Sequence, residues 1–508
     1  MLSLWRVFAI FGRASLTSPR AGLKPPRYER RPVNRAPEAG FEPAWQLARR
    51  LQARADSVIN SAGTNRPPSA NALSSWRRLL PILALVTAAC GLLPPPATPN
   101  SRPAPTGSAV VTPGSNATAA SANQTPAGPG GTPAGPIGLR VWLPPEFTPD
   151  VSTPGGLALA GQIRAFENNH PGVAVEIRTK ADSGLGGLLS ALTTASNAAP
   201  SILPDVIALS RDDLVSAAAA GLVAPLDPWV PAGTLADFYP YAQAMGRVNG
   251  VWVGLPFAAD APVLAYLSST YASPPLHWTD VLTGPLLVPA GESTGLTVLN
   301  TYLAAGGTLA DANGKLHLNP DILSQALQVF QRLQLAGTLP QTTLAFANAS
   351  LTWQAFREQR ATLAVTSAGL FLAEYLRVDG ASATLLPSDG DTPLALADGW
   401  SWAIVNTAPD RRTLAAQLIN WLIAPEQSAP WTEAAAVLPT RAASLAAWKS
   451  PRLAPVASDV VAHAQLQPPG AQLATLGPVL QQALADVLSQ RATPFAAATV
   501  AAGAVNQP

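Results

Sequence analysis

Short apolar runs alternate with longer amphipathic segments along the chain after residue 137. The apolar runs, which have the length of buried β-strands, are LRVWL (139–143), VAVEI (173–177) and PDVIAL (204–209). The segments that follow them repeat apolar residues at helical spacing, which predicts helices over 157–170, 186–198 and 212–221. This alternation predicts βαβ units with a largely parallel sheet, so ligand-binding loops are expected at the carboxyl ends of the strands.

Turn and capping residues support the same fold class further along the chain. Gly221 is expected at the position just after the third helix, where a left-handed residue is common. Asn313-Gly314 predicts a tight turn before a short strand. Asn319 and Pro320 then predict the N-cap and the first residue of another helix. The residues around this turn lack the ligand spacing of an EF-hand calcium loop.

An apolar run over residues 79–89, preceded by Arg77 and Arg78, leads to Cys90, which is the single cysteine of the 508-residue chain. The run is too short for a membrane span, which needs about 20 residues, and it fits the apolar region of a secretory signal. The small residues before Cys90 resemble a bacterial lipobox, whose cysteine receives lipid and becomes the new N-terminus. A buried helix with a core cysteine is the alternative, but the Pro/Ser/Thr-rich tract after Cys90 disfavours it.

These features divide the N-terminal part of the chain into three segments. Residues 73–89 are predicted to be a lipoprotein signal peptide, and residues 90–136 a lipid anchor followed by a disordered tether rich in Pro, Ser, Thr and Ala. Residues 1–72 form a doubtful extension without hydrophobic periodicity. Met1 and Met245 are the only methionines, so a mis-assigned start is a hypothesis that requires a non-Met codon near Leu73.

Charge is distributed unevenly between this N-terminal part and the rest of the chain. Residues 1–78 carry 14 Lys and Arg against 4 Asp and Glu. The remaining chain carries 18 basic and 26 acidic residues and has a net charge of −8. The remaining chain therefore lacks the basic footprint of a nucleic-acid-binding protein.

A dozen motifs in consistent order resemble the family 1 extracellular solute-binding proteins of ABC-type sugar importers, a family that includes the maltose-binding protein. They cover nearly all of residues 137–445 and include VWLPPEF, FENNHPGVAVEI, PDVIALSRDDL, AAGLVAPLDPWV, NGVWVGLPFAADAPVLAYL, DGWSWAIVNTAPDRRTLAAQLINWLIAPEQS and VLPTR. The resemblance implies the α/β, two-lobed periplasmic-binding-protein (type II) fold, with a hinge near 260–266 and an interlobe cleft that closes on a sugar. The first lobe is expected at 137–262 plus 393–439, and the second at 263–392 plus 440–508.

The resemblance also implies a biological setting. The protein would be an extracytoplasmic monomer, anchored to the cell membrane by lipid on Cys90, that delivers a carbohydrate to ABC permease subunits. Those subunits must be separate chains, because this sequence has no GxxxxGK[ST] nucleotide loop and no predicted spanning helix. Nucleic acid is not an expected partner.

Acidic candidate contacts follow from the resemblance. Glu146 and Phe147 in WLPPEF, and Asp212 and Asp213 after PDVIAL, match contact positions of the family. A solvated loop acid is the alternative for Glu146, and a helix cap is the alternative for the two aspartates. Asp260, in LPFAAD near the hinge, aligns with an acidic family contact. Carboxylates suit paired sugar hydroxyls because they offer two acceptors at fixed spacing.

The aromatic candidates are Trp400 and Trp402 in GWSWAI. Their spacing places both on one face of a predicted strand, so both face the cleft or both face the core. Trp400, at the start of the strand, is the preferred platform for a sugar ring, although most buried tryptophans are simply core. Glu292, in the glycine-flanked loop PAGESTG, is a further candidate.

Two positions depart from the family pattern. Relatives carry a tryptophan where this chain has Gly369, which leaves Phe371 as the nearest aromatic candidate. Gln359 replaces a glycine that usually precedes the same strand. The aromatic platform of the second lobe, and with it the class of ligand, therefore stays open.

Two other functions are compatible with the sequence. A secreted two-carboxylate glycosidase is one, because the spacing of its carboxylates exists only in three dimensions. A non-transporting sugar sensor is the other, because it would use the same binding site. The sequence contains no HExxH motif and its histidines are scattered, so no catalytic residue, metal or cofactor is expected.

Overall fold

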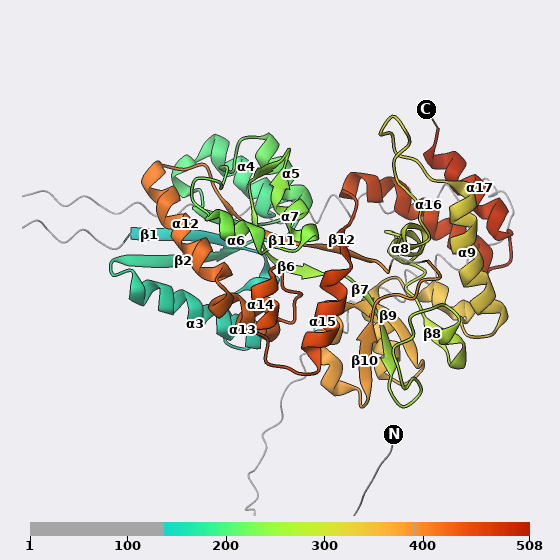
Figure 1. Ribbon diagram of the computed structural model, residues 1–508. Coiled ribbons are helices and arrows are strands. Elements are labelled where there is room, and N and C mark those ends of the chain that lie inside the picture. Colours follow the sequence, from blue (N-terminus) through green and yellow to red (C-terminus); the bar gives the residue numbers. More distant parts are fainter. Residues whose placement is uncertain (1–136, 391–392, 508) are drawn as a thin grey trace, which may run out of the picture. The chain divides into compact units, whose positions relative to one another are not determined.

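The computed structural model describes residues 137–390 and 393–507, and the described elements form two groups, each built on its own β-sheet (Figure 1). The predictions for residues 1–136, including the signal peptide, the lipidated Cys90 and the tether, lie outside the described residues. Within the described residues, no helix is long and apolar enough to cross a membrane.

The first group is built on a six-stranded sheet with the order β12-β11-β3-β1-β2, in which β6 also pairs with β11. β1 runs parallel to β2 and β3, as the alternating pattern predicts, whereas β11 runs antiparallel to β3 and β6. The strands are β1 (Ile137–Leu143), β2 (Val173–Thr179), β3 (Val206–Ser210), β6 (Leu255–Asp260), β11 (Ala395–Ile404) and β12 (Ala464–Leu466).

The three helices predicted between and after these strands are present as α3 (Pro154–Asn169), α4 (Leu188–Ala198) and α5 (Arg211–Ala219). α3 begins three residues before the predicted start because the Thr153 hydroxyl accepts a hydrogen bond from Gly156 N and Pro154 fits the first turn. Gly221 has a φ of +68°, which confirms its predicted left-handed position after α5.

Further helices and a small hairpin complete the first group. The helices are α6 (Ala232–Ala236), α7 (Pro240–Gly246), α12 (Pro409–Ile423), α13 (Pro425–Ala435) and α14 (Ala442–Ala446). β4 (Arg247–Val248) and β5 (Val251–Trp252) form the hairpin. α3 and α13 pack against each other, and α12 packs against β1 and β11.

The second group contains a four-stranded sheet with the order β10-β7-β9-β8. Its strands are β7 (Pro262–Leu267), β8 (Leu286–Leu287), β9 (Leu363–Ser367) and β10 (Ala381–Thr384). Its helices are α8 (Leu296–Ala304), α9 (Pro320–Leu335), α10 (Ala349–Arg357), α11 (Ala368–Glu374), α15 (Leu453–Ala462), α16 (Gly470–Leu488) and α17 (Pro494–Val505). α9, α16 and α17 pack together around buried leucines and alanines.

The chain crosses between the two sheets at several places. β6 passes into β7 through Ala261 alone, inside the predicted hinge region. β11 begins beside α8, where Asn300 donates to Leu394 O (3.2 Å), and it ends within the six-stranded sheet. β12 pairs with β11, so residues 464–466 belong to the first sheet although residues 440–508 were assigned to the second lobe.

The turn and cap predicted near residue 315 are confirmed in part. Gly314 has a φ of +77°, and its N–H donates to Asp311 O (3.0 Å). The short strand predicted after this turn is reduced to one isolated bridge between Ala310 and Leu316. Asn319 caps α9 as predicted, since its side chain accepts hydrogen bonds from Asp321 N and Ile322 N.

A buried ion pair holds the first sheet together near the starts of β1 and β3. Asp205 has no exposed surface and accepts hydrogen bonds from Arg140 N (2.8 Å) and from Arg411 Nε (2.6 Å). Arg411 also donates to Gly138 O (2.6 Å). The pair therefore ties α12 to β1 and to the start of β3, the strands that lead to Glu146 and Ser210.

Candidate ligand-binding site

Two adjoining cavities lie where the strands of the first sheet end. The first cavity has a volume of about 390 Å³ and is lined by Glu146, Phe147, Ser210, Ala258, Ala259, Asp260, Asp398, Gly399, Trp400, Ala435 and Val437. Glu146 follows β1, Ser210 ends β3 and Asp260 ends β6. The cavity thus occupies the edge at which an α/β sheet binds its ligands.

The second cavity has a volume of about 190 Å³ and shares Asp260 and Asp398 with the first. Its other walls come mainly from the second group of elements, and include Pro289, Glu292, Leu296 and Thr297 beside α8 and Val365, Thr366 and Ser367 on β9. Because both sheets contribute to it, we call the two cavities together the cleft.

Four of the predicted residues therefore line the first cavity: Glu146, Phe147, Asp260 and Trp400. A fifth, Glu292, lines the second cavity. Their positions in sequence are far apart, and the fold brings them together by placing β1, β6 and β11 in one sheet and the start of α8 opposite.

An aromatic cluster forms the floor of the first cavity. The rings of Phe147 and Trp400 meet edge to face with centroids 5.9 Å apart, and Phe147 meets Phe257 in the same way at 5.2 Å. Phe257 stacks on Trp402 at 4.2 Å. Trp400 is only partly buried and lines the cavity, so it can offer part of its ring to a ligand.

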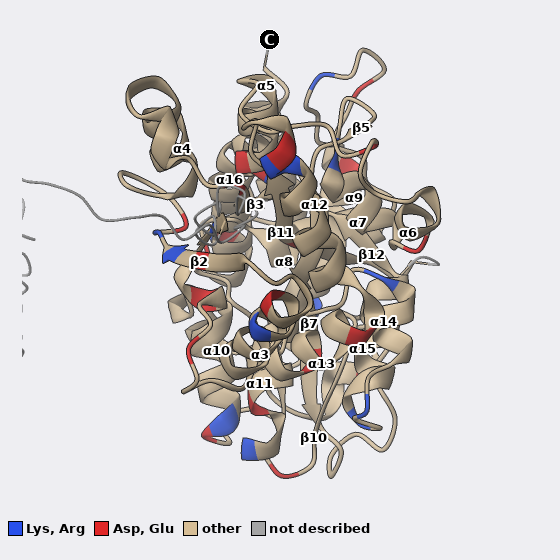
Figure 2. Cartoon of the chain, turned by 90° about the vertical axis from the view of Figure 1, so that its left-hand side faces the viewer, with Lys and Arg blue, Asp and Glu red and all other residues tan. Residues whose placement is uncertain are grey.

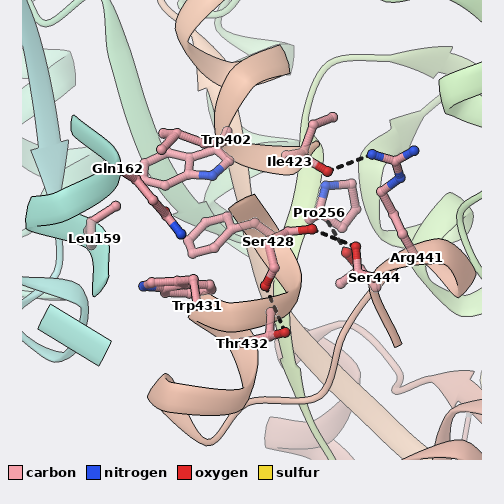
Figure 3. Close-up of a pocket in the computed structure, with 13 residues that line it drawn as sticks. Leu159, Gln162, Pro256, Trp402, Ile423, Ser428, Trp431, Thr432, Arg441 and Ser444 are labelled. Atoms are coloured by element: carbon pink, nitrogen blue, oxygen red, sulfur yellow. Dashed lines mark hydrogen bonds between the residues drawn. The ribbon is translucent and has the colours of Figure 1, made fainter. Parts of the chain in front are cut away.

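Trp402 lies below this floor and not in the cleft. It is 3% exposed and borders an interior cavity of about 20 Å³. Figure 3 shows Trp402 and Trp431 on opposite sides of that interior space, with the Gln162 side chain directed between them. Such a volume holds about one water molecule and no sugar, so the prediction that Trp402 contacts the ligand finds no support here.

Asp260 lies where the two cavities meet. Its Oδ1 accepts hydrogen bonds from Ala261 N (2.8 Å) and Gly369 N (2.9 Å), so residues on both sides of the cleft fix the carboxylate. The side chain is open to solvent within the cleft. The surrounding protein nevertheless raises the pKa of Asp260 by desolvation, an effect that the hydrogen bonds from Gly369, Ser367 and Ala261 oppose.

The space around residue 369 explains why a glycine fits there. A Cβ atom at this position would lie 3.4 Å from Asp260 Oδ2 and 3.3 Å from Ala436 O. A large side chain here would therefore start in contact with the carboxylate and fill part of the cleft. Gly369 leaves Asp260 accessible, whereas a tryptophan at this position would cover it.

The other cleft carboxylates also hold their protons more tightly than usual. Desolvation at the cavity wall raises the pKa of Glu146, and the charges of Asp182 and Asp260 add to the rise. Desolvation likewise raises the pKa of Asp398, although hydrogen bonds from Gly399 and Gln467 oppose it. Glu292 follows the same direction, and Thr297 N donates to it at 3.1 Å.

Asp212 and Asp213 lie at the first turn of α5 and do not line either cavity. Figure 2 shows acidic residues in red and basic residues in blue close to α5. Asp212 Oδ2 accepts a hydrogen bond from Gly470 N (2.8 Å), the first residue of α16. This contact joins the first group of elements to the second. Asp212, which was predicted to contact the ligand, here contacts the second lobe.

Phe371 is placed in the core. It is 2% exposed, and its ring meets Trp353 edge to face with centroids 6.3 Å apart. The burial of Phe371 therefore gives no support to the prediction that it replaces the missing aromatic platform. α11 turns this side chain inward, while Gly369, the second residue of the helix, donates its N–H to Asp260.

Asp398 is the functional candidate that the sequence reasoning missed. It lies in β11 directly before Gly399 and Trp400, opposite Asp260 in the antiparallel pairing, and it lines both cavities. Its position two residues before Trp400 in the motif DGWSW was the available signal, because alternate strand residues share a face.

The cleft carboxylates do not form a metal site. Among the described residues, no group of three or more His, Cys, Asp or Glu side chains is arranged to hold a metal ion. The carboxylates are instead spread along the two cavities, which suits several separate contacts to one extended molecule.

Comparison with known proteins identifies the chain. The family model for bacterial extracellular solute-binding proteins matches residues 161–459, which is more than half of the chain. The chain belongs to this family. The match includes Asp260, Glu292, Asp398 and Trp400, whereas Glu146 and Phe147 precede its first residue.

Solved structures confirm the two-lobed fold. The cyclic alpha-maltosyl-1,6-maltose binding protein from Arthrobacter globiformis matches with a TM-score of 0.60 and 20% identity, over 73% of this chain and 98% of that one. The sugar-binding protein MalE from Xanthomonas citri matches with a TM-score of 0.60 and 18% identity, over 73% and 96%. A solute-binding protein from Thermotoga lettingae, bound with α-D-tagatose, gives a TM-score of 0.56 and 19% identity, over 73% and 99%.

Proposed function

We propose that this solute-binding protein is an extracytoplasmic receptor that captures a carbohydrate in its cleft and delivers it to an ABC permease. The observation that carries the proposal is the first cavity, in which the partly exposed Trp400 lies beside Glu146, Asp260 and Asp398. The sugar-binding proteins among the structural neighbours support the same class of ligand.

The chemistry of the cavity fits a sugar. A pyranose ring has an apolar C–H face, which an aromatic ring can cover, and a rim of hydroxyl groups, which carboxylates can accept in pairs. Trp400 supplies the ring, and the edge-to-face contact with Phe147 holds it in place. Asp260 is fixed by two backbone N–H groups, which leaves its second oxygen for a ligand hydroxyl.

Calorimetric titration of the full chain with a panel of mono- and oligosaccharides tests the proposal. We expect one saccharide to bind, and Trp400→Ala to weaken its binding by about tenfold or more, because a well-ordered aromatic contact contributes on the order of 1–2 kcal/mol. Trp229→Ala is the matched control, because Trp229 is also partly buried but lies outside both cavities, under the guanidinium of Arg412. Absence of heat with every saccharide, or equal losses for both variants, would contradict the proposal.

Membrane attachment is proposed to occur through lipid on Cys90. The supporting observation is the basic and apolar run before this residue and the small residues directly preceding it. In the native host, Cys90→Ala should move the protein from the membrane fraction to the soluble fraction. A variant that stays in the membrane fraction would exclude this anchor.

Delivery to a permease distinguishes an import receptor from a sensor that only reports occupancy. Deleting the gene should abolish uptake of the saccharide found by titration, and the purified protein should retain ABC permease subunits. Unchanged uptake together with a retained signalling partner would favour the sensor.

A two-carboxylate glycosidase is the second candidate, because Glu146 and Asp260 line one cavity. Desolvation raises the pKa of both carboxyl groups, and the charge of Asp260 adds to the rise at Glu146. Such pairs can divide the roles of acid and base. Incubating the pure protein with the saccharide that it binds decides the question. Hydrolysis that Glu146→Gln abolishes would establish the enzyme, and intact saccharide after prolonged incubation would leave the receptor.

A further inference from the structure

Four carboxylates line the cleft without a cationic partner. They are Glu146, Asp260, Glu292 and Asp398. No Lys, Arg or His lines either cavity. Among the described residues, the ion pairs within 4 Å connect other acids, such as Asp205 and Asp237, to arginines or to His463, and none includes a cleft carboxylate.

Further acids surround the same region. Asp182 adds to the upward shift of the pKa of Glu146, and Asp212 adds to that of Asp398. The charge of Arg211 acts in the opposite direction and lowers the pKa of Asp398, but its Nη1 donates to Met245 O (3.1 Å). The local negative charge is therefore only partly compensated by the protein itself.

An unpaired negative cluster is costly in a cleft that must close over its ligand. Closure removes water from the carboxylates, and burying charges without partners costs far more than burying paired ones. A neutral sugar offers hydroxyl hydrogen bonds but no charge. A cationic ligand would offer both, and charge-assisted hydrogen bonds are the stronger kind.

The geometry argues for a molecule larger than a metal ion. The carboxylates are divided between two cavities joined at Asp260 and Asp398, and no three of the described acidic side chains gather around one point. The partly exposed ring of Trp400 borders the same space, and an aromatic face attracts both an ammonium group and a sugar ring.

We propose that the solute held in this cleft is a saccharide with protonated amino groups. The inference rests on the proposed carbohydrate-receptor function and adds the charge of the ligand to it. Glu292 and Asp398 are the residues that select the ammonium groups, because they face the cavities without a fixed cationic partner. A cleft lined by one sign of charge also speeds the arrival of an oppositely charged ligand.

A matched pair of disaccharides tests the inference. The β-1,4-linked glucosamine dimer and cellobiose share their ring and linkage and differ in an amine or a hydroxyl at the second carbon. In calorimetric titrations of the full chain near neutral pH, we expect the amine to bind about tenfold tighter or more, which is about 1.4 kcal/mol per factor of ten. Added salt should weaken the binding of the glucosamine dimer and leave the affinity for cellobiose nearly unchanged.

Variants assign the preference to the cleft. Asp398→Asn and Glu292→Gln should each reduce the preference for the amine several-fold, since their amides still accept hydroxyl hydrogen bonds. Asp379→Asn is the control, because Asp379 is exposed on the turn before β10 and lines neither cavity. If one cleft variant fails to fold, the other variant and the salt dependence of the wild type still give a result.

The outcomes separate this inference from the proposed function. Equal or tighter binding of cellobiose, or of the uncharged N-acetylated dimer, would overturn the charge inference and leave the carbohydrate receptor standing. Binding of spermidine but of no saccharide would overturn both, as would the absence of binding by every compound.

Discussion

Replacing Arg411 by alanine tests how the sheet beneath the cleft is held together. Asp205 has no exposed surface, and Arg411 donates to it from both Nε and Nη2. Without the guanidinium, the carboxylate keeps one described hydrogen bond, from Arg140 N at 2.8 Å. Gly138 O loses its bond to Arg411 as well.

The expected cost follows from this geometry. Removing one partner of a buried ion pair costs about 3–5 kcal/mol, because the other charge stays buried and unpaired. Arg411 is 31% exposed, so solvent already screens part of the pair. We therefore expect the lower end of the range, a loss of about 3 kcal/mol in the free energy of unfolding.

Urea unfolding of the full chain measures the effect through the transition midpoint at unchanged slope. Arg412→Ala is the matched control, because the neighbouring Arg412 makes a weaker, exposed bond to Asn406 Oδ1 (3.3 Å) and should cost about 1 kcal/mol or less. A loss below about 1 kcal/mol for Arg411→Ala, or equal losses for the two variants, would refute the account of the buried pair.

Three further predictions concern the contact between lobes, pH and a strained position. Gly470→Ala places a Cβ atom in steric overlap with Asp212 Oδ2, so it should disturb the contact between the two groups of elements and weaken ligand affinity several-fold. Asp212→Ala should give a similar loss, and unchanged affinity in both variants would contradict this role. Burial raises the pKa of Glu292 in the folded protein above the ordinary value of 4.5. The ionised carboxylate therefore lowers the free energy of unfolding at pH values above the folded pKa, and this loss is absent below pH 4.5. Glu292→Gln should therefore gain stability over the wild type as pH rises through that window, and a pH-independent difference would refute the assignment. Gln359 has a φ of +57°, so Gln359→Gly should raise the unfolding midpoint by an amount equivalent to about 0.5–1 kcal/mol, and a lower midpoint would show that this backbone is not strained.

Local sequence signals predicted the first part of the fold well. β1, β2 and β3 and the helices between them follow from apolar periodicity, and the Thr153 and Ser210 hydroxyls fix where α3 and α5 begin. These signals act within a few residues, so they survive without knowledge of the tertiary structure. The assignment of β12 to the first sheet depends instead on pairing with a distant strand, β11, which no local pattern in residues 464–466 reveals.

The sequence predicted those residues of the candidate site that lie at or just after the end of a strand. Glu146, Phe147, Asp260 and Trp400 were predicted and line one cavity. Asp212 could not be separated from them, because its partner, Gly470, lies 258 positions away in sequence.

The two aromatic predictions that did not reach the cleft both depend on tertiary packing. Trp400 and Trp402 do share a face of β11, but they lie at different depths in the aromatic cluster. Trp400 lies at the cavity wall beside Phe147, whereas Trp402 stacks on Phe257 in the core. Phe371 shows the same limit, because only the packing of α11 against Trp353 decides which side of the helix is buried.

A crystal structure of the protein with the saccharide that binds most tightly in titration tests the central claim most directly. The account predicts a sugar ring against Trp400, with its polar groups at Asp260 and Asp398 and the two lobes closed around it. A saccharide bound away from these residues, or a cleft that stays empty at saturating saccharide, would contradict it.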